Sequence, residues 1–156
     1  VALAPETAER LAKHPNIQAF KEATGSLDSA REILNRTNLA LLSGDDSLTL
    51  PFASVGGVGV VSVVSNIVPE KIAALCSAFN AGKWDAARTL HFELLPLSRG
   101  LLSLDTNPIP VKTAMKLLGR DTGALRLPMC PPTKPVSEAI HKLLATAGLM
   151  QTTGVA

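Results

Sequence analysis

Short apolar runs divide the first half of the chain, and segments with apolar residues at helical spacing lie between them. The run at 17–25 has one lysine, Lys21, in its middle and a turn signal at its end, which predicts a short strand. The apolar run at 39–43 and the valine-rich run at 59–64 are typical of strands buried in a parallel sheet. The sequence therefore predicts three strands, about 20 residues apart, with helices between them.

Three helices are predicted around these strands. One covers 5–13 and is opened by a proline, a second begins after Ser26 as its N-cap, and a third covers 47–55. Alternating strands and helices are typical of both a doubly wound sheet and an eight-stranded barrel. The pattern alone leaves both folds open.

From Pro69 onward the pattern is purely helical. Pro96 lies inside the longest predicted helix, where a proline removes a backbone donor, so we expect a kink or a break there. The proline-rich stretch 125–135 is expected to be irregular. The predicted helices cover 69–82, 84–102, 107–118 and 136–147.

Composition excludes several classes of protein. Of the 156 residues, 46% are hydrophobic, which is enough to bury a core. The 15 basic and 13 acidic residues are interspersed and only 3% are aromatic, so no nucleic-acid-binding surface is indicated. The longest weakly polar run, 55–68, is shorter than the ~20 residues of a membrane-spanning helix, and no secretory signal opens the chain. Cys76 and Cys130 are isolated, so we expect no disulfide framework and a reducing, cytoplasmic setting.

Several polar or glycine-rich patterns have simple structural interpretations. The glycines of 56–59 follow a predicted helix and precede a strand, the reverse of a dinucleotide-binding fingerprint, so a tight turn with positive φ is expected. Asp45 and Asp46 are better placed to cap the following helix than to bind a metal. Ser43 and Ser62 lack the context of a nucleophile elbow. The three histidines have no metal-ligand spacing; they are His14, His91 and His141.

Lys21 is the strongest candidate for chemistry. Its neighbours Ala19, Phe20 and Ala23 are apolar, and a buried ammonium is tolerated only when it is paired or neutralised. A free lysine side chain titrates near ~10.4, so nucleophilic chemistry requires a desolvated site that raises its free-amine fraction. We interpret Lys21 as a nucleophilic amine. An exposed lysine at a strand end is the alternative that the pattern leaves open.

Five motifs occur in order along the chain: KEATG at 21–25, LLSGDD at 41–46, GGVGVVSV at 56–63, NPIPVK at 107–112 and LRLPM at 125–129. In this order they resemble the dihydrodipicolinate synthase family, and the resemblance extends from about residue 3 to residue 149. It implies an α/β fold. Residues 1–82 would form the last three strand-helix units of a (β/α)8 TIM barrel, and residues 83–156 a C-terminal helical region packed on it. The five units that open the family's barrel have no counterpart here.

The resemblance implies a Schiff-base lyase of lysine biosynthesis, in the diaminopimelate pathway. Lys21 matches the family's lysine that forms an imine with pyruvate. The imine becomes an enamine, which condenses with L-aspartate 4-semialdehyde to give 4-hydroxy-tetrahydrodipicolinate. Gly44 and Val61 match positions whose backbone lines the pyruvate pocket. Val63 would supply apolar wall and Asn66 would support it, with no metal and no cofactor besides the covalent imine.

The family's proton-relay hydroxyls, and the arginine that binds the aldehyde's carboxylate, belong to the upstream half of the barrel. This chain has no tyrosine to replace the relay. We therefore expect it to act in a homo-oligomer or with a complementary barrel half. Two alternatives remain: a non-catalytic half-barrel with a binding or structural role, and a sister aldolase acting on a sugar acid such as sialic acid or a keto-deoxy acid.

Overall fold

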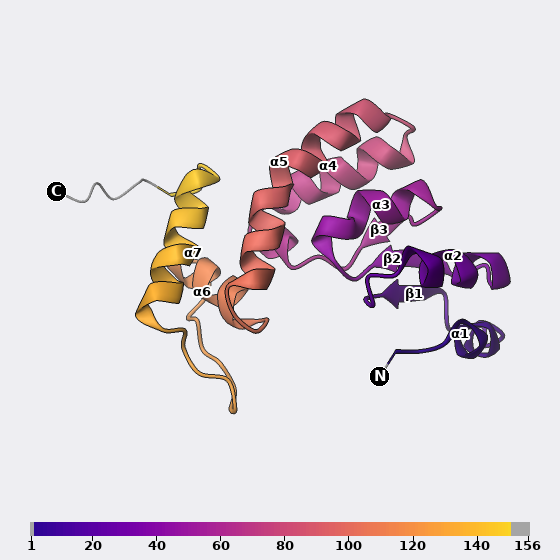
Figure 1. The fold of residues 1–156 in the computed structure, drawn as a ribbon, viewed down its shortest axis with the longest axis horizontal. Helices are drawn as coiled ribbons and strands as arrows, with labels where there is room; N and C mark the ends of the chain where they lie inside the picture. The colour runs from indigo at the N-terminus through magenta and orange to yellow at the C-terminus, as the bar shows by residue number, and fades with distance from the viewer. Residues whose placement is uncertain (1, 151–156) are drawn as a thin grey trace.

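A parallel three-stranded sheet carries the N-terminal part of the chain (Figure 1). The computed structural model describes residues 2–150. The strands lie in the order β1-β2-β3, with Lys21 opposite Leu42 and Leu42 opposite Gly59. This arrangement confirms the predicted α/β class. The strands are β1 (Ala19–Glu22), β2 (Ala40–Ser43) and β3 (Gly59–Val60).

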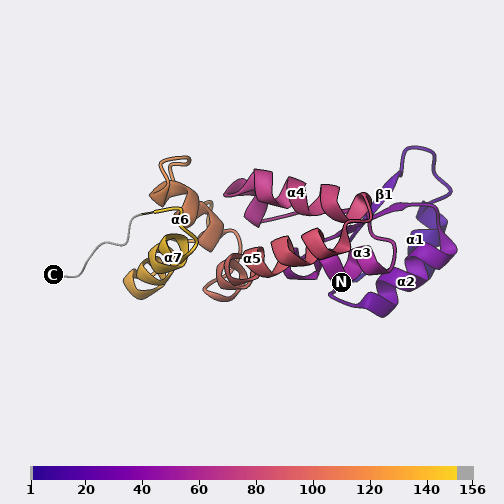
Figure 2. The same ribbon diagram turned by 90° about the horizontal axis from the view of Figure 1, so that it is seen from above.

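Helices follow each strand and then continue without further strands in the rest of the described range. Figures 1 and 2 show an elongated molecule, with the sheet near the N-terminus and α6 and α7 toward the opposite end. The α-helices are α1 (Pro5–Leu11), α2 (Leu27–Arg36), α3 (Thr49–Ser54), α4 (Pro69–Asn80), α5 (Trp84–Ser103), α6 (Ile109–Leu117) and α7 (Lys134–Thr146). Two 3-10 helices are η1 (Asp46–Leu48) and η2 (Val64–Asn66).

The third strand is much shorter than predicted. The sequence predicted a strand over 59–64, but β3 has two residues, and the chain then turns into η2. The backbone N–H groups of Val63 and Val64 donate to the carboxylate of Asp46, at 2.8 and 3.2 Å, instead of to a strand. The first strand, β1, is likewise shorter than the strand-like run at 17–25 that predicted it.

Local signals predicted several helix ends correctly. Ser26 caps α2 by accepting the Ser29 N–H at 3.1 Å. Gly56 and Gly82 follow α3 and α4 with φ values of 108° and 72°, which glycine adopts without steric strain. A kink or a break was predicted at Pro96: the break is absent, because α5 is continuous through this residue, whereas Figure 1 shows the helix bending along its length.

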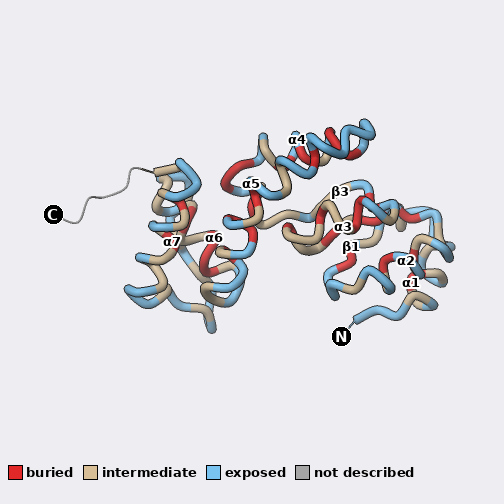
Figure 3. The backbone as a smooth tube through the Cα atoms, turned by 45° about the horizontal axis from the view of Figure 1, so that its top comes forward, coloured by how far each residue is buried: buried red, intermediate tan, exposed pale blue. Residues whose placement is uncertain are grey.

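The hydrophobic core is divided into two clusters. The smaller cluster joins α1, α2 and α3 to one face of the sheet; its buried residues are Ala8, Ala30, Ile33, Leu41 and Phe52. The larger cluster joins α3 and η2 to the helices α4 to α7, and includes Phe79, Leu101 and Leu144. Figure 3 shows buried and exposed positions alternating along α4, as expected for a helix with one face in a core.

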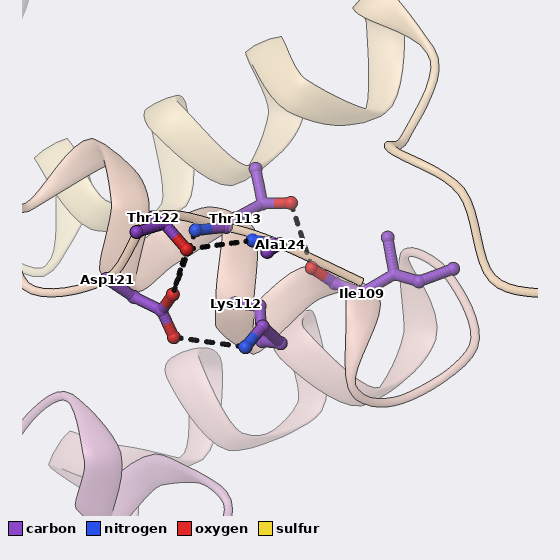
Figure 4. Close-up of polar contacts among 7 residues, drawn as sticks. Ile109, Lys112, Thr113, Asp121, Thr122 and Ala124 are labelled. Carbon is purple, nitrogen blue, oxygen red and sulfur yellow. Dashed lines mark hydrogen bonds and ion pairs between the residues drawn. The ribbon is translucent and has the colours of Figure 1, made fainter. Parts of the chain in front are cut away.

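Polar contacts fix the segment that follows α6 (Figure 4). Asp121 accepts the Gly123 N–H at 2.9 Å and pairs with the Lys112 ammonium at 3.2 Å. The neighbouring Arg120 guanidinium donates to the carbonyl oxygen of Ile67 at 2.7 Å. These contacts connect the segment after α6 both to α6 and to the chain that follows β3.

Gly44 follows β2 where that strand approaches β1 closely. A Cβ atom at this position would lie 2.5 Å from the Ala23 Cβ and 2.9 Å from the Glu22 carbonyl oxygen. Replacing Gly44 by Ala should push the ends of β1 and β2 apart and destabilise the chain by about 1–3 kcal/mol, as measured by urea denaturation. Gly59→Ala is the matched control, because its Cβ would meet only the flexible tip of Leu42, at 3.1 Å. Equal losses of stability would contradict the steric argument.

The pair formed by Lys112 and Asp121 makes stability depend on pH. The Gly123 N–H and the Lys112 ammonium hold the pKa of Asp121 below its ordinary value. Such a carboxylate stabilises the fold above its unfolded-state pKa and loses that contribution as the pH falls through its folded-state pKa. We expect Asp121→Asn to melt at a lower temperature than the unaltered chain at neutral pH, and the difference to shrink below about pH 4. Melting temperatures are measured by circular dichroism. A difference between the two proteins that stays the same at all pH values would argue against a stabilising role for this pair.

Candidate active site on the open face of the sheet

Lys21 lies on the open face of the sheet. Side chains alternate along β1, so Phe20 and Glu22 face the helices, whereas Lys21 is exposed to solvent. The prediction that Lys21 is buried among apolar neighbours is therefore wrong for this chain, because Phe20 lies on the opposite face and cannot desolvate the amine. Burial of Lys21 would have to come from further strands packed on the open face.

Gly44 and Val61 lie on the same face as Lys21. The ladder of hydrogen bonds extends beyond the strands, with the Gly44 N–H donating to the Glu22 carbonyl at 2.6 Å and the Val61 N–H to the Ser43 carbonyl at 2.8 Å. The strand register and the alternation of side chains then place both positions on the Lys21 face, at the carboxyl ends of the strands. The structure thus brings three predicted site residues to one edge.

Val63 and Asn66 lie beyond this edge, in the segment that leads into η2. Val63 is half-buried and packs against the larger core cluster. The side-chain amide of Asn66 donates to the Val63 carbonyl oxygen at 3.0 Å. Asn66 therefore supports the backbone next to the edge, and the role of Val63 as an apolar wall stays a prediction.

The carboxylate of Asp46 is the polar feature that the sequence did not predict. The residue is 4% exposed, and its carboxylate accepts hydrogen bonds from all three residues of the loop 62–64. Both acids were predicted to cap the following helix. Asp45 does so, by accepting the Ser47 N–H at 2.8 Å. Asp46 instead binds a loop that lies 16 to 18 residues further along the chain, and a contact over that separation leaves no local signal.

Glu22 fixes the turn that follows Lys21. Glu22 is 2% exposed, and its carboxylate accepts the Thr24 N–H at 2.8 Å and the Thr24 hydroxyl at 2.9 Å. The same hydroxyl oxygen accepts the Ser26 N–H at 3.2 Å. The KEATG motif is thus the end of β1 and the turn that follows it, and the buried carboxylate of Glu22 stabilises that turn.

The remaining candidates form no second site within residues 2–150. No group of three His, Cys, Asp or Glu side chains in that range is placed to hold a metal ion. Ser43 is fully buried, and its hydroxyl donates to the Asp45 carbonyl oxygen at 2.7 Å. Cys76 and Cys130 are free thiols. Among the helices of this range, none combines the length and the apolar character that crossing a bilayer requires.

Two hollows differ in their relation to Lys21. One of about 370 Å³ is lined by Lys21 together with Leu3, Phe20 and Thr24. A larger one, of about 540 Å³, is lined by the connections from α1 to β1 and from α2 to β2, at the amino ends of the strands. Enzymes built on (β/α)8 barrels hold their active sites at the carboxyl ends. The smaller hollow therefore adjoins the candidate site at Lys21, although neither Gly44 nor Val61 lines it.

Proteins of known name are similar in sequence to almost the whole of this chain. A profile of the dihydrodipicolinate synthetase family matches residues 1–147. The 4-hydroxy-tetrahydrodipicolinate synthase of Cyanothece sp. is 49% identical over 150 residues, which are 95% of this chain and 51% of the relative. The enzyme of the same name from Nitratidesulfovibrio vulgaris is 48% identical over 151 residues, again 95% and 51%.

Solved structures agree with this relationship. Dihydrodipicolinate synthase from Aquifex aeolicus is 37% identical with a TM-score of 0.89, covering 94% of this chain and 50% of that one. The chloride-inhibited dihydrodipicolinate synthase from Acinetobacter baumannii, complexed with pyruvate, is 32% identical with a TM-score of 0.89, covering 96% and 52%. This chain spans about half the length of the relatives that it matches, in agreement with a partial TIM barrel. It belongs to the dihydrodipicolinate synthase family.

Proposed function

We propose that this chain carries the imine-forming half of a 4-hydroxy-tetrahydrodipicolinate synthase, with Lys21 as the residue that binds pyruvate. The observation behind this is the placement of Lys21, Gly44 and Val61 on one face, at the carboxyl ends of three parallel strands. That edge is where barrel enzymes hold their active sites. The names of the relatives favour this reaction over that of a sugar-acid aldolase.

In the proposed reaction the neutral amine of Lys21 attacks the ketone carbon of pyruvate, and the adduct takes up a proton from the relay of the complementary half and loses water to give a protonated imine. The imine nitrogen accepts an electron pair when a proton leaves the pyruvate methyl group, which gives an enamine. The enamine carbon then forms a bond to the aldehyde carbon of L-aspartate 4-semialdehyde; the C=O π bond opens, its oxygen takes up a proton from the relay, and the nitrogen electron pair re-forms the imine. No further cofactor is needed, because the imine itself is the electron sink.

The rest of the proposed site has to come from a complementary barrel half, in a longer chain or a second subunit. Burial disfavours the charged ammonium, but Lys21 is exposed here, so strands packed on the open face have to desolvate it. They also have to supply the proton relay, since this chain has no tyrosine. We place 1–82 in the barrel and 83–156 in a helical region packed on it; residues 1 and 151–156 of these ranges lie outside the described residues. The free thiols of Cys76 and Cys130 support a cytoplasmic location.

A chimera tests the role of Lys21. The amino-terminal half of the Cyanothece sp. synthase, which this chain does not match, is fused to the 156 residues. Incubation with pyruvate and borohydride should reduce the imine to a stable adduct on Lys21. Mass spectrometry of peptides should find the adduct there and not on Lys71 or Lys112.

Two lysine variants provide the control. Lys21→Arg keeps the positive charge but cannot form an imine, so both the adduct and synthase turnover should disappear. Lys71→Arg keeps the surface ion pair with Glu93 and should retain both. An adduct distributed over surface lysines, or near-normal turnover of Lys21→Arg, would contradict the assignment. A well-folded chimera that traps no pyruvate would favour a non-catalytic half-barrel.

The open face also predicts how the 156-residue chain behaves without a partner. β1 and β3 are the two edges of the described sheet, and Val58 and Val61 are 45% and 44% exposed. Unpaired edges and exposed apolar side chains favour association. Size-exclusion chromatography with light scattering should give a mass above 16.3 kDa and no synthase turnover. A single species of 16.3 kDa that unfolds cooperatively would refute this expectation.

A further inference from the structure

Asp46 is a buried carboxylate with both oxygens occupied. One oxygen accepts the hydroxyl of Ser62, and the other accepts the N–H groups of Val63 and Val64, at 2.8 and 3.2 Å. The Ser62 hydroxyl oxygen in turn accepts the Ser65 N–H at 2.7 Å. One carboxylate therefore holds four consecutive residues, three directly and the fourth through a serine.

These contacts begin where the sheet ends. The last hydrogen bond between β2 and the chain after β3 joins the Val61 N–H to the Ser43 carbonyl at 2.8 Å. The N–H groups of Val63 and Val64 then have no strand to bind, and Asp46 accepts them instead. Hydrogen bonds to an ionised carboxylate are stronger and shorter than those between neutral groups, so the carboxylate can replace a strand here.

Val61 is fixed on both sides. Its own N–H donates to the Ser43 carbonyl oxygen, and the hydroxyl of the next residue, Ser62, donates to Asp46. Within residues 2–150 no hydrogen bond reaches the Val61 carbonyl oxygen, so this oxygen is held at the edge without an internal partner. A carbonyl oxygen that is held in place and has no hydrogen-bond partner within the chain is available to accept a hydrogen bond from a ligand.

We propose that Asp46 is a positioning residue, which holds the loop 62–64 so that the Val61 carbonyl oxygen keeps its place on the edge next to Lys21. This inference rests on the function proposed above. It assigns Asp46 no contact with substrate, because the carboxylate is buried and its two oxygens already accept three hydrogen bonds.

Hydrogen exchange of the 156-residue chain tests the contact without any substrate. Asp46→Ala removes both acceptor oxygens, so the amides of Val63 and Val64 should exchange at least about tenfold faster. Asp46→Asn keeps one acceptor oxygen and should give a smaller increase. Asp121→Asn is the matched control, because it alters a carboxylate that also accepts a backbone N–H, and it should leave the loop 62–64 unchanged. Unchanged exchange in Asp46→Ala would overturn the proposal.

Borohydride trapping in the chimera tests the effect on pyruvate. Asp46→Asn should raise the pyruvate concentration for half-maximal trapping about tenfold, because the edge loses its fixed geometry. The pH dependence of trapping should stay the same, because Asp46 exchanges no proton with substrate. An unchanged half-saturation, or an altered pH profile, would overturn the proposal. If the unaltered chimera traps no pyruvate, the proposed function fails, while hydrogen exchange still decides whether Asp46 holds the loop.

Discussion

Helices cover one face of the β1-β2-β3 sheet, and the alternation of side chains along each strand assigns every residue to that covered face or to the open one. On the covered face Leu41 and Ser43 are fully buried and Glu22 is nearly so. On the open face Lys21 and Val61 remain exposed. The chain therefore buries the face of the sheet that contributes to its own core. The residues of the proposed reaction lie on the other face, which no helix of the described range covers.

Acidic side chains stabilise the carboxyl ends of all three strands. Backbone N–H groups leave the ladder there and need new acceptors, because a buried donor without a partner is costly. Glu22 accepts the Thr24 N–H after β1, Asp45 accepts the Ser47 N–H after β2, and Asp46 accepts two N–H groups after β3. Hydrogen bonds to carboxylates therefore hold the backbone at the edge that carries the candidate site.

The sequence predicts features that depend on adjacent residues and misses those that depend on distant ones. Ser26 is recognisable as a cap because its partner lies three residues away. The exposure of Lys21 depends on what packs on the open face, which no local pattern encodes. The short β3 depends on Asp46, and the continuity of α5 through Pro96 depends on core packing along the helix. The five motifs, through the family, singled out Lys21, Gly44 and Val61, which lie at one edge; their roles stay predictions, and the motifs carry no information on their surroundings.

The division of the core into two clusters bears on how the chain is made. The larger cluster is built mainly from α4 to α7, which are neighbours in sequence, and local contacts of this kind form rapidly. The smaller cluster, under the sheet, has only five buried residues. A ribosome delivers the N-terminal part of a chain first. The strands therefore emerge before most of the helices, and α3, which contributes Phe52 to the smaller cluster and Ala53 to the larger one, lacks part of its packing until α4 to α7 have been translated.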